Sequence, residues 1–341
     1  MKKKSFLLFF LILLTLFALA GCKKHSSGEA LSKVTLNEVA HSIFYAPQYL
    51  ADSLGYFKEE GLEIDLINAN GADKVTAALL SNDAQIGLQG PEPTIYLYKN
   101  NKSNYLINFA QLTRTDGSFI FGRIPIENFT LADLKGKSIL GGRKGGVPEM
   151  TLEYVLKQAG LNVGQDDDTK DVNVRTDVAF AALTGSFLEG EGDFVSLFEP
   201  TATTLINQKK AYLLAATAEY AGEITYTAYS TTLDYYNNNK EVLEKFTRAL
   251  YKGQKFVENA TDKEIAETVQ PFFTDINLDV LIEVVNRYRS INAWCKTPMF
   301  SKEGFNRLQD IMIEAKELDS KVEFNDLVRL DIAEKVIKDE K

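Results

Sequence analysis

The strongest constraint on the fold is an alternation of short apolar runs with helical segments that begins near residue 34. The apolar runs either alternate with polar residues or are continuous, whereas the segments between them repeat apolar residues at helical spacing. Strands that alternate with helices form βαβ units with a mostly parallel sheet. We therefore expect strands at 34–40, 62–67, 84–88 and 105–112, with helices at 47–54, 73–80 and 94–98.

The same alternation starts again after residue 118. Here the expected strands are 119–123, 137–140, 172–175, 193–198 and 212–216, and the expected helices are 149–158, 178–183 and 201–208. An extended run at 225–231 is followed by a tail with helices expected at 241–253, 262–268, 278–288, 302–318 and 327–338.

Two α/β units of about 100 residues each exceed one typical core and predict two lobes. The expected fold is α/β, with the lobes joined by strands that cross near 113–118 and 220–226. The first part of lobe one is expected at 34–117 and lobe two at 118–222. Residues 223–341 are expected to return to lobe one and cover it with the C-terminal helices.

The N-terminus has the layout of a secretory signal peptide. Lys2, Lys3 and Lys4 precede an almost unbroken apolar run from Phe6 to Ala20, and small residues lead into Cys22. This arrangement resembles a bacterial lipobox, which implies removal of residues 1–21, lipid on Cys22 and a polar tether at 22–33. The alternative is an uncleaved anchor, but the run is shorter than the ~20 residues of a spanning helix. The expected location is the extracytoplasmic face of the cell membrane.

Composition excludes several classes of protein. The chain has 341 residues and a formal net charge of −9, which argues against nucleic acid as a partner because such binding needs a basic face. With Cys22 lipidated, only Cys295 remains, so no internal disulfide is expected. With two cysteines and two histidines in all, we expect no metal site. We also predict no cofactor, and a monomer.

Several segments resemble one family of solute-binding proteins. These segments are Glu38–Ala51, Gly55–Leu62, Gly71–Lys74, Asp83–Gly87, Asp133–Lys137 and Glu199–Pro200. Together they are similar to the nitrate/sulfonate/taurine and thiamine-pyrimidine substrate-binding proteins. The resemblance implies a bilobal type II periplasmic-binding fold, a small-molecule ligand between the lobes, and an ABC permease with its ATPase as partners. The loop Gln89–Pro93 departs from the sulfonate-binding members because it introduces the carboxylate of Glu92.

A general rule for open α/β sheets selects candidate ligand contacts. Ligands bind beyond the carboxyl ends of the strands, so the loops that follow the predicted strands are the first places to search. The candidates are His41, Phe44, Tyr45, Asn70, Gly71, Gln89, Gly90, Glu92, Gln111, Gly142, Arg143, Gly145, Gly146, Glu199 and Tyr226.

These candidates carry charges of both signs. The loop from Gly141 to Gly146 precedes a helix and contains Arg143 and Lys144, so it is either an anion site at a helix start or a surface loop with solvated charges. Glu92 and Glu199 favour a cation or an amine. We prefer Glu199 as the ligand acceptor and interpret Glu149 as a helix-start charge.

Aromatic side chains with a carboxylate favour a nitrogen heterocycle as the ligand, such as a thiamine pyrimidine or another vitamin precursor. Phe44 and Tyr45 lie in a predicted loop and can stack on a flat ring. The alternative is an anion of the alkanesulfonate, taurine or nitrate type. A further alternative is an enzyme of thiamine or menaquinone biosynthesis, but no nucleophile–base constellation is visible, so we expect a binding protein.

Overall fold

The first sheet combines the strands of the first α/β unit with one strand that returns from later in the chain. The computed structural model describes residues 30–100, 103 and 105–340, and Ser32–Lys341 form one compact unit. β1 (Ser32–Glu38) pairs in parallel with β2 (Leu62–Asn68) and β3 (Ile86–Gln89). β11 (Thr227–Thr232) runs antiparallel between β3 and β4 (Leu106–Thr113), which gives the order β2-β1-β3-β11-β4.

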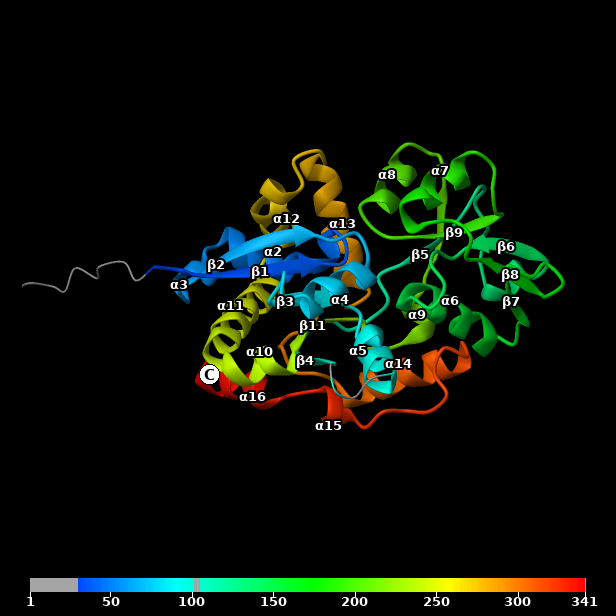
Figure 1. Ribbon diagram of the computed structural model, residues 1–341. Helices are drawn as coiled ribbons and strands as arrows, with labels where there is room; N and C mark the ends of the chain where they lie inside the picture. Colours follow the sequence, from blue (N-terminus) through cyan, green and yellow to red (C-terminus); the bar gives the residue numbers. More distant parts are fainter. Residues whose placement is uncertain (1–29, 101–102, 104, 341) are drawn as a thin grey trace, which may run out of the picture. The chain divides into compact units, whose positions relative to one another are not determined.

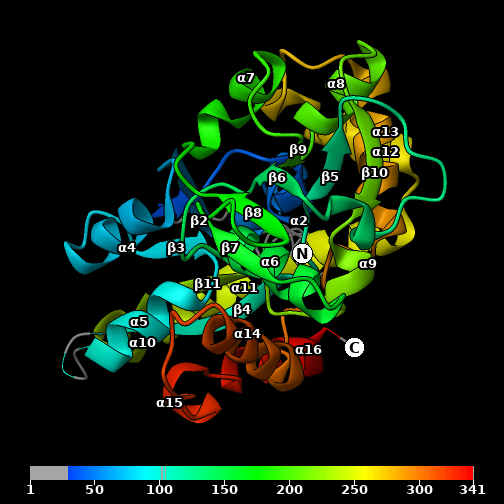
Figure 2. The same cartoon turned by 90° about the vertical axis from the view of Figure 1, so that its right-hand side faces the viewer.

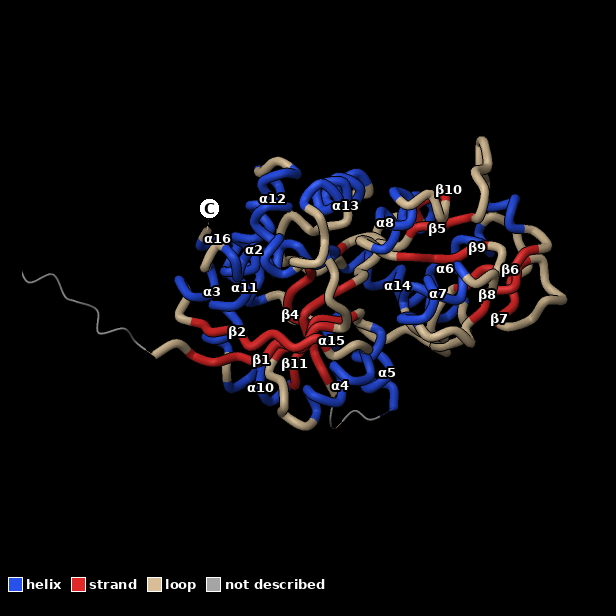
Figure 3. Tube along the Cα trace, turned by 90° about the horizontal axis from the view of Figure 1, so that it is seen from above, coloured by secondary structure: helices blue, strands red, loops and turns tan. Residues whose placement is uncertain are grey.

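Helices cover both faces of this sheet. Every residue of β3 and of β4 is buried, as is usual for strands that are covered on both sides. Figure 3 shows α4 (Ala72–Leu80) and α5 (Glu92–Asn100) on one side of these strands. On the other side lie α2 (Ala46–Ser53), α3 (Tyr56–Glu59) and α11 (Lys240–Asn259).

The second sheet has six strands in the order β10-β5-β9-β6-β8-β7 (Figure 2). β6 (Lys137–Leu140), β7 (Val163–Gln165), β8 (Val172–Arg175) and β9 (Phe194–Leu197) are parallel. β5 (Phe119–Gly122) is antiparallel to both β9 and β10 (Tyr212–Ala216). Its helices are α6 (Val147–Gln158), α7 (Leu183–Leu188) and α8 (Thr201–Asn207). The sequence does not predict β7, because only one of its three residues is a large apolar one.

The chain crosses between the sheets twice, where the sequence predicts it. Residues 114–118 connect β4 to β5, and residues 217–226, which include α9 (Ala218–Ala221), connect β10 to β11. The two crossing segments are hydrogen-bonded to each other: the Ile224 N–H donates to the Arg114 carbonyl (2.9 Å), and the Thr217 N–H donates to the Ser118 carbonyl (3.1 Å). The predicted α/β class, with two units joined by crossing segments, is therefore confirmed.

The C-terminal helices contact helices of both sheets, so their packing extends beyond the cover of lobe one that the sequence predicts. α11 packs against α2 and α16 (Asp331–Asp339), but α13 (Leu278–Ser290) contacts α8, and α14 (Lys302–Glu314) contacts α6 (Figure 1). α12 (Asp262–Val269) and the 3₁₀ helix η4 (Gln270–Phe272) connect α11 to α13.

The helix predicted at 327–338 is interrupted. α15 (Phe324–Leu327) ends where Val328 forms an isolated parallel bridge with Asn108 of β4, and α16 starts only at Asp331. The Arg329 N–H donates to the Asn108 carbonyl (2.9 Å), so this piece of chain satisfies the edge of β4 instead of continuing a helix.

The expected signal peptide, Cys22 and the beginning of the tether lie outside the described residues. Across 30–100 and 105–340, no helix combines the length and the apolarity that crossing a membrane requires.

Candidate functional site

The ends of the first sheet's strands lie against loops of the second sheet. The Ser42 hydroxyl donates to the Glu199 carbonyl (3.3 Å), and the Tyr96 hydroxyl donates to the Gly145 carbonyl (3.2 Å). Between these contacts five side chains come together: Phe44, Tyr45, Glu92, Asp116 and Tyr226. We call this group the intersheet site. Its members come from the first lobe and from both crossing segments, and none is more than 5% exposed.

Phe44 is the aromatic centre of the intersheet site. Ser42 caps the 3₁₀ helix η1 (Ile43–Tyr45) by accepting a hydrogen bond from the Phe44 N–H (3.2 Å). The Phe44 ring lies 5.7 Å from Tyr226 and 6.0 Å from Phe198, both edge-on. Gly117 permits this packing, because a Cβ there would lie 2.6 Å from the Phe44 ring. Phe44 and Tyr45, which the sequence predicts in a loop, thus lie in a short 3₁₀ helix, and their stacking on a ligand ring stays a prediction.

Glu92 brings a buried carboxylate to the site. It occupies the first turn of α5 and is 3% exposed. Its Oε2 has no hydrogen-bond partner and lies over Gly90, where a Cβ would be only 2.0 Å away. Burial raises the pKa of Glu92 to about 7, although its own backbone N–H and the charge of Arg143 act in the opposite direction. Glu92 is therefore a hydrogen-bonding group with spare capacity at neutral pH.

Asp116 is the member that sequence reasoning missed. It is fully buried in the first crossing segment, and its Oδ1 accepts from the N–H (2.7 Å) and the hydroxyl (2.5 Å) of Ser118. Its Oδ2 has no partner with full hydrogen-bond geometry among the described residues, and Tyr226 is its polar neighbour. Burial raises the pKa of Asp116 to about 6. Its position in a predicted crossing between lobes is the signal that could have found it.

Tyr226 faces the same place from the second crossing segment. Its hydroxyl is buried and lacks a partner with hydrogen-bond geometry. Burial raises its pKa well above the usual value, and the charges of Asp116 and Glu92 raise it further. Tyr226 is thus within electrostatic reach of both carboxylates.

His41 points away from the intersheet site, contrary to its predicted role. Its Nδ1 lies 2.7 Å from Oε1 of the buried Glu38, and its Nε2 lies 2.9 Å from the Phe272 carbonyl. The ring also stacks on Phe273 at 4.7 Å. This histidine therefore connects the loop after β1 to η4 through a hydrogen bond.

Glu199, the ligand acceptor that we preferred from sequence, is occupied by protein groups. Thr203 donates to its carboxylate through the backbone N–H (2.8 Å) and the hydroxyl (2.9 Å), and Arg287 of α13 lies 2.6 Å away. Its backbone N–H donates to the Tyr288 hydroxyl (3.1 Å). Glu199 joins the second sheet to α13, and Glu92 has the free acceptor instead.

The Gly-rich loop offers little to an anion. The Gly145 N–H already donates to the buried carboxyl group of Glu149 in the first turn of α6 (3.0 Å). Burial, with the neighbouring Glu153, raises the pKa of Glu149 to about 8. Lys144 approaches Glu317 at 4.0 Å, and Arg143 is exposed. Gly142 adopts a φ of 90° beside Leu183, and Gly146 is the N-cap of α6.

The remaining candidates have partners elsewhere. Gln89 accepts from the Thr76 hydroxyl (3.1 Å) on the first sheet. Gln111 is held by the C-terminal region, because its Oε1 accepts from the Ser301 N–H (2.8 Å). Asn70 is exposed, and the Gly71 N–H donates to the Val39 carbonyl (2.9 Å). The structure does not bring these four residues into the intersheet site.

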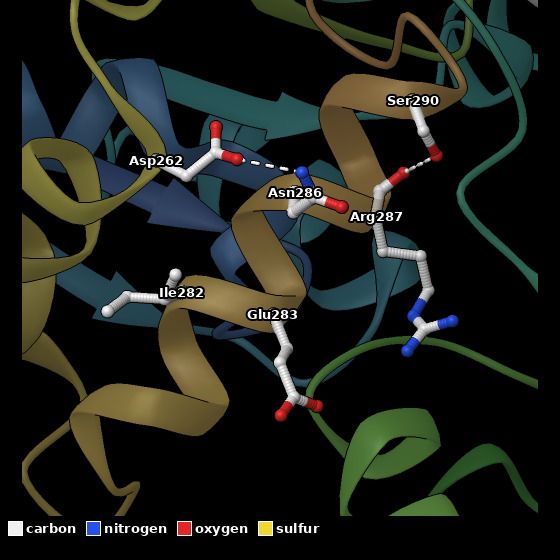
Figure 4. Close-up of a pocket in the computed structure, with 6 residues that line it drawn as sticks. All are labelled: Asp262, Ile282, Glu283, Asn286, Arg287 and Ser290. Carbon is white, nitrogen blue, oxygen red and sulfur yellow. Dashed lines mark hydrogen bonds between the residues drawn. The ribbon is translucent and has the colours of Figure 1, made fainter.

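Two surface hollows have none of the predicted ligand contacts in their linings. The first, of about 370 Å³, is lined by Asp262, Ile282, Glu283, Asn286, Arg287 and Ser290 (Figure 4). The second, of about 570 Å³, is lined by Tyr154, Lys302, Glu303, Asn306, Arg307 and Asp310. Among the described residues, no group of three or more His, Cys, Asp or Glu side chains is placed to hold a metal ion.

Solved structures confirm the expected fold. The alkanesulfonate-binding protein SsuA from Xanthomonas axonopodis pv. citri, bound to MOPS, superposes with a TM-score of 0.70 at 16% identity. The match covers 89% of this chain and 99% of that one. At this identity the likeness shows the fold alone, which is the bilobal periplasmic-binding architecture.

Two relatives are similar in sequence. "Putative binding protein YtlA" of Bacillus subtilis (strain 168) is 40% identical over 321 residues, which is 94% of each chain. The 4-amino-5-hydroxymethyl-2-methylpyrimidine phosphate synthase of Aspergillus parasiticus is 26% identical over 67% of this chain and 65% of its own. The family model described as "NMT1/THI5 like" matches residues 43–263. The chain belongs to the NMT1/THI5-like family.

Proposed function

We propose that this chain is the solute-binding component of an ABC importer and that it captures an amino-bearing nitrogen heterocycle at the intersheet site. A thiamine pyrimidine or a related vitamin precursor fits this class. The similarity to a protein named as a binding protein and to a solved alkanesulfonate-binding protein supports the transport role. Its partners would be an ABC permease and its ATPase.

The observation that carries the ligand proposal is the unpaired, buried Oε2 of Glu92 beside aromatic rings. A buried acceptor without a partner is costly, so such groups in native proteins call for an explanation. An amino group on a flat ring would donate to Glu92 while the ring packs against Phe44, Tyr45 or Tyr226. Aromatic pairs of this kind contribute about 0.5–1.5 kcal/mol beyond the area that they bury.

An alkanesulfonate or another anion is the second candidate, because SsuA is bound to MOPS in its structure. A sulfonate at the intersheet site would approach Glu92 and Asp116, and two carboxylates disfavour a negative ligand. Arg143 is the cation whose charge reaches Glu92, but its side chain is exposed. The charges of the site therefore favour the heterocycle.

We further propose that the chain binds its ligand without chemical turnover, although one relative is named as a synthase. The proposed location is the extracytoplasmic face of the cell membrane, with lipid on Cys22 and residues 22–33 as the tether. The basic Lys2–Lys4 and the apolar run that ends before Cys22 support this. Two acyl chains are enough for stable anchoring.

Calorimetric titration of the purified chain tests the ligand class. We expect 4-amino-5-hydroxymethyl-2-methylpyrimidine to bind and to be recovered unchanged, whereas ethanesulfonate and nitrate should not bind. If ethanesulfonate binds and the pyrimidine does not, the ligand is an anion and the heterocycle proposal is wrong.

The Glu92→Gln substitution identifies the site. A hydrogen bond to a charged group is worth about 1.5–3 kcal/mol, so its loss should weaken pyrimidine binding roughly tenfold or more. Glu63→Gln is the matched control, because Glu63 is exposed on β2 and its substitution should leave the affinity unchanged. If both variants bind like the wild type, Glu92 does not contact the ligand.

A further inference from the structure

The two crossing segments each place a buried polar group at the intersheet site. Asp116 lies on the segment from β4 to β5, and Tyr226 lies on the segment from β10 to β11. Asp116 is fully buried and Tyr226 is 3% exposed. Among the described residues, neither the Asp116 Oδ2 nor the Tyr226 hydroxyl has a partner with full hydrogen-bond geometry, although the two groups are close enough for each to shift the pKa of the other.

Of the two carboxylate oxygens of Asp116, Oδ1 is the one that accepts hydrogen bonds from Ser118. The Ser118 hydroxyl in turn lies 2.9 Å from that of Thr217 on the other crossing segment. These contacts fix the position of the carboxyl group. They leave Oδ2 with the Tyr226 hydroxyl as its polar neighbour and with room in its lone pairs for a further donor.

Asp116 and Tyr226 belong to the same electrostatic environment as Glu92. The charge of Asp116 raises the pKa of Tyr226 more than that of Glu92 does, which indicates that Asp116 is the stronger neighbour of this hydroxyl. A ligand whose ring lies beside Tyr226 can therefore meet one carboxylate at Glu92 and a second at Asp116.

We infer that Asp116, with Tyr226, forms a second recognition point that takes a second hydrogen-bond donor of the ligand, and that it prefers a protonated amine to a hydroxyl. This inference rests on the proposed function. The preferred ligand class is then a nitrogen heterocycle that carries two donor groups, one for Glu92 and one for Asp116.

The location gives this contact a mechanical consequence. The crossing segments are the connections about which the two sheets must rotate if the protein opens, and they are hydrogen-bonded to each other next to Asp116 and Tyr226. A donor bound here contacts both connections at once. It thereby stabilises the arrangement in which the two sheets enclose the ligand.

A series of three pyrimidines tests the inference. The compounds are 4-amino-2-methylpyrimidines that carry methyl, hydroxymethyl or aminomethyl at ring position 5. In the wild type the aminomethyl compound should bind at least tenfold more tightly than the methyl compound. In Asp116→Asn that ratio should fall tenfold or more while the affinity for the methyl compound stays within about twofold, because a charge-assisted bond is lost only with the amine.

Glu92→Gln and Asp65→Asn are the matched controls. Glu92→Gln should weaken all three compounds to a similar extent, and Asp65→Asn removes an exposed carboxylate on β2 and should change nothing. An unchanged preference for the amine in Asp116→Asn would overturn the inference and leave the proposed function standing. An equal loss for all three compounds would also overturn it.

A second measurement tests, without a ligand, whether the fold needs the charge of Asp116. The folded-state pKa of Asp116 is about 6, above its ordinary value, so the folded protein loses stability as the pH rises from about 4 to 6. Asn keeps an acceptor for Ser118 and removes the unpaired charge. Asp116→Asn should therefore raise the melting temperature of the ligand-free chain by about 2 °C at pH 7.5 and leave it unchanged at pH 4.

A lower melting temperature of Asp116→Asn at pH 7.5 would show a structural carboxylate and overturn the inference. If none of the three pyrimidines binds the wild type, the proposed function fails. A stabilised Asp116→Asn would in that case still support a donor-binding site of different ligand chemistry.

Discussion

His41 lies between a carboxylate and a backbone carbonyl, an arrangement that favours its imidazolium form. The Phe272 carbonyl accepts from Nε2, and Nδ1 lies 2.7 Å from the Glu38 carboxylate, so protonation of both ring nitrogens satisfies both contacts. The hydrogen bond to Glu38 raises the pKa of His41 above its usual 6.5, against the effect of burial. We expect an NMR titration of His41 to give a pKa above 6.5.

The same linkage predicts how stability depends on pH. A histidine with a raised folded-state pKa stabilises fully below its unfolded pKa, and this contribution is lost as the pH rises through the folded pKa. The wild type should therefore lose stability above pH 6.5 as His41 loses its proton, and His41→Gln should not show this loss. A titration midpoint at or below 6.5 in the native protein would refute the imidazolium assignment.

Residue by residue, four candidate ligand contacts from the sequence lie together in the structure. Phe44, Tyr45, Glu92 and Tyr226 are candidates because each follows or precedes an apolar strand, and their contact with a ligand stays a prediction. Whether a carboxylate is free depends on tertiary partners that no local pattern reveals. Arg287 lies 88 positions after Glu199 in the chain, so its occupation of that carboxylate could not be foreseen.

At the scale of elements, periodicity predicts the strands and the longer helices, since burial decides both patterns. Periodicity does not predict the structure where contacts with other elements, and not the local spacing of apolar residues, determine it. β7 is too short to show an alternation of apolar and polar residues. The tail helices α13 and α14 have ordinary amphipathic faces, and such a face does not reveal that its partner is a helix of the second sheet. The bridge at Val328 divides a helical pattern because the edge of β4 needs a partner.

The ion pair between α13 and the second sheet should contribute measurably to stability. Glu199 is 2% exposed, and burial raises its pKa although Thr203 and Arg287 lower it. Arg287→Met leaves this carboxylate without a cation, which should lower the free energy of unfolding by about 2–4 kcal/mol at neutral pH.

Urea unfolding of Arg287→Met at several pH values measures this contribution. The deficit should disappear below about pH 4, where Glu199 is protonated in both proteins. Arg289→Met is the matched control on the same helix, because its pair with Asp262 is more exposed and should be worth less than about 1 kcal/mol. Equal effects of the two substitutions would contradict a special role for Arg287.

At the scale of the whole molecule, the two sheets, the crossing segments and α13 converge on one small region. The first sheet contributes Phe44 and Glu92, the crossing segments contribute Asp116 and Tyr226, and the second sheet meets them through Phe198 and Glu199. A ligand at the proposed intersheet site would contact the first lobe and both crossing segments. This geometry suits capture and release, which is the task of a solute-binding protein.

A crystal structure of the chain with 4-amino-5-hydroxymethyl-2-methylpyrimidine tests this account most directly. The account predicts the ring between the two sheets beside Phe44 and Tyr226, with its amino group within about 3.2 Å of Glu92 and its hydroxymethyl group toward Asp116. Density for the pyrimidine in the hollow beside α13, or between the sheets with its donors directed away from both carboxylates, would contradict it.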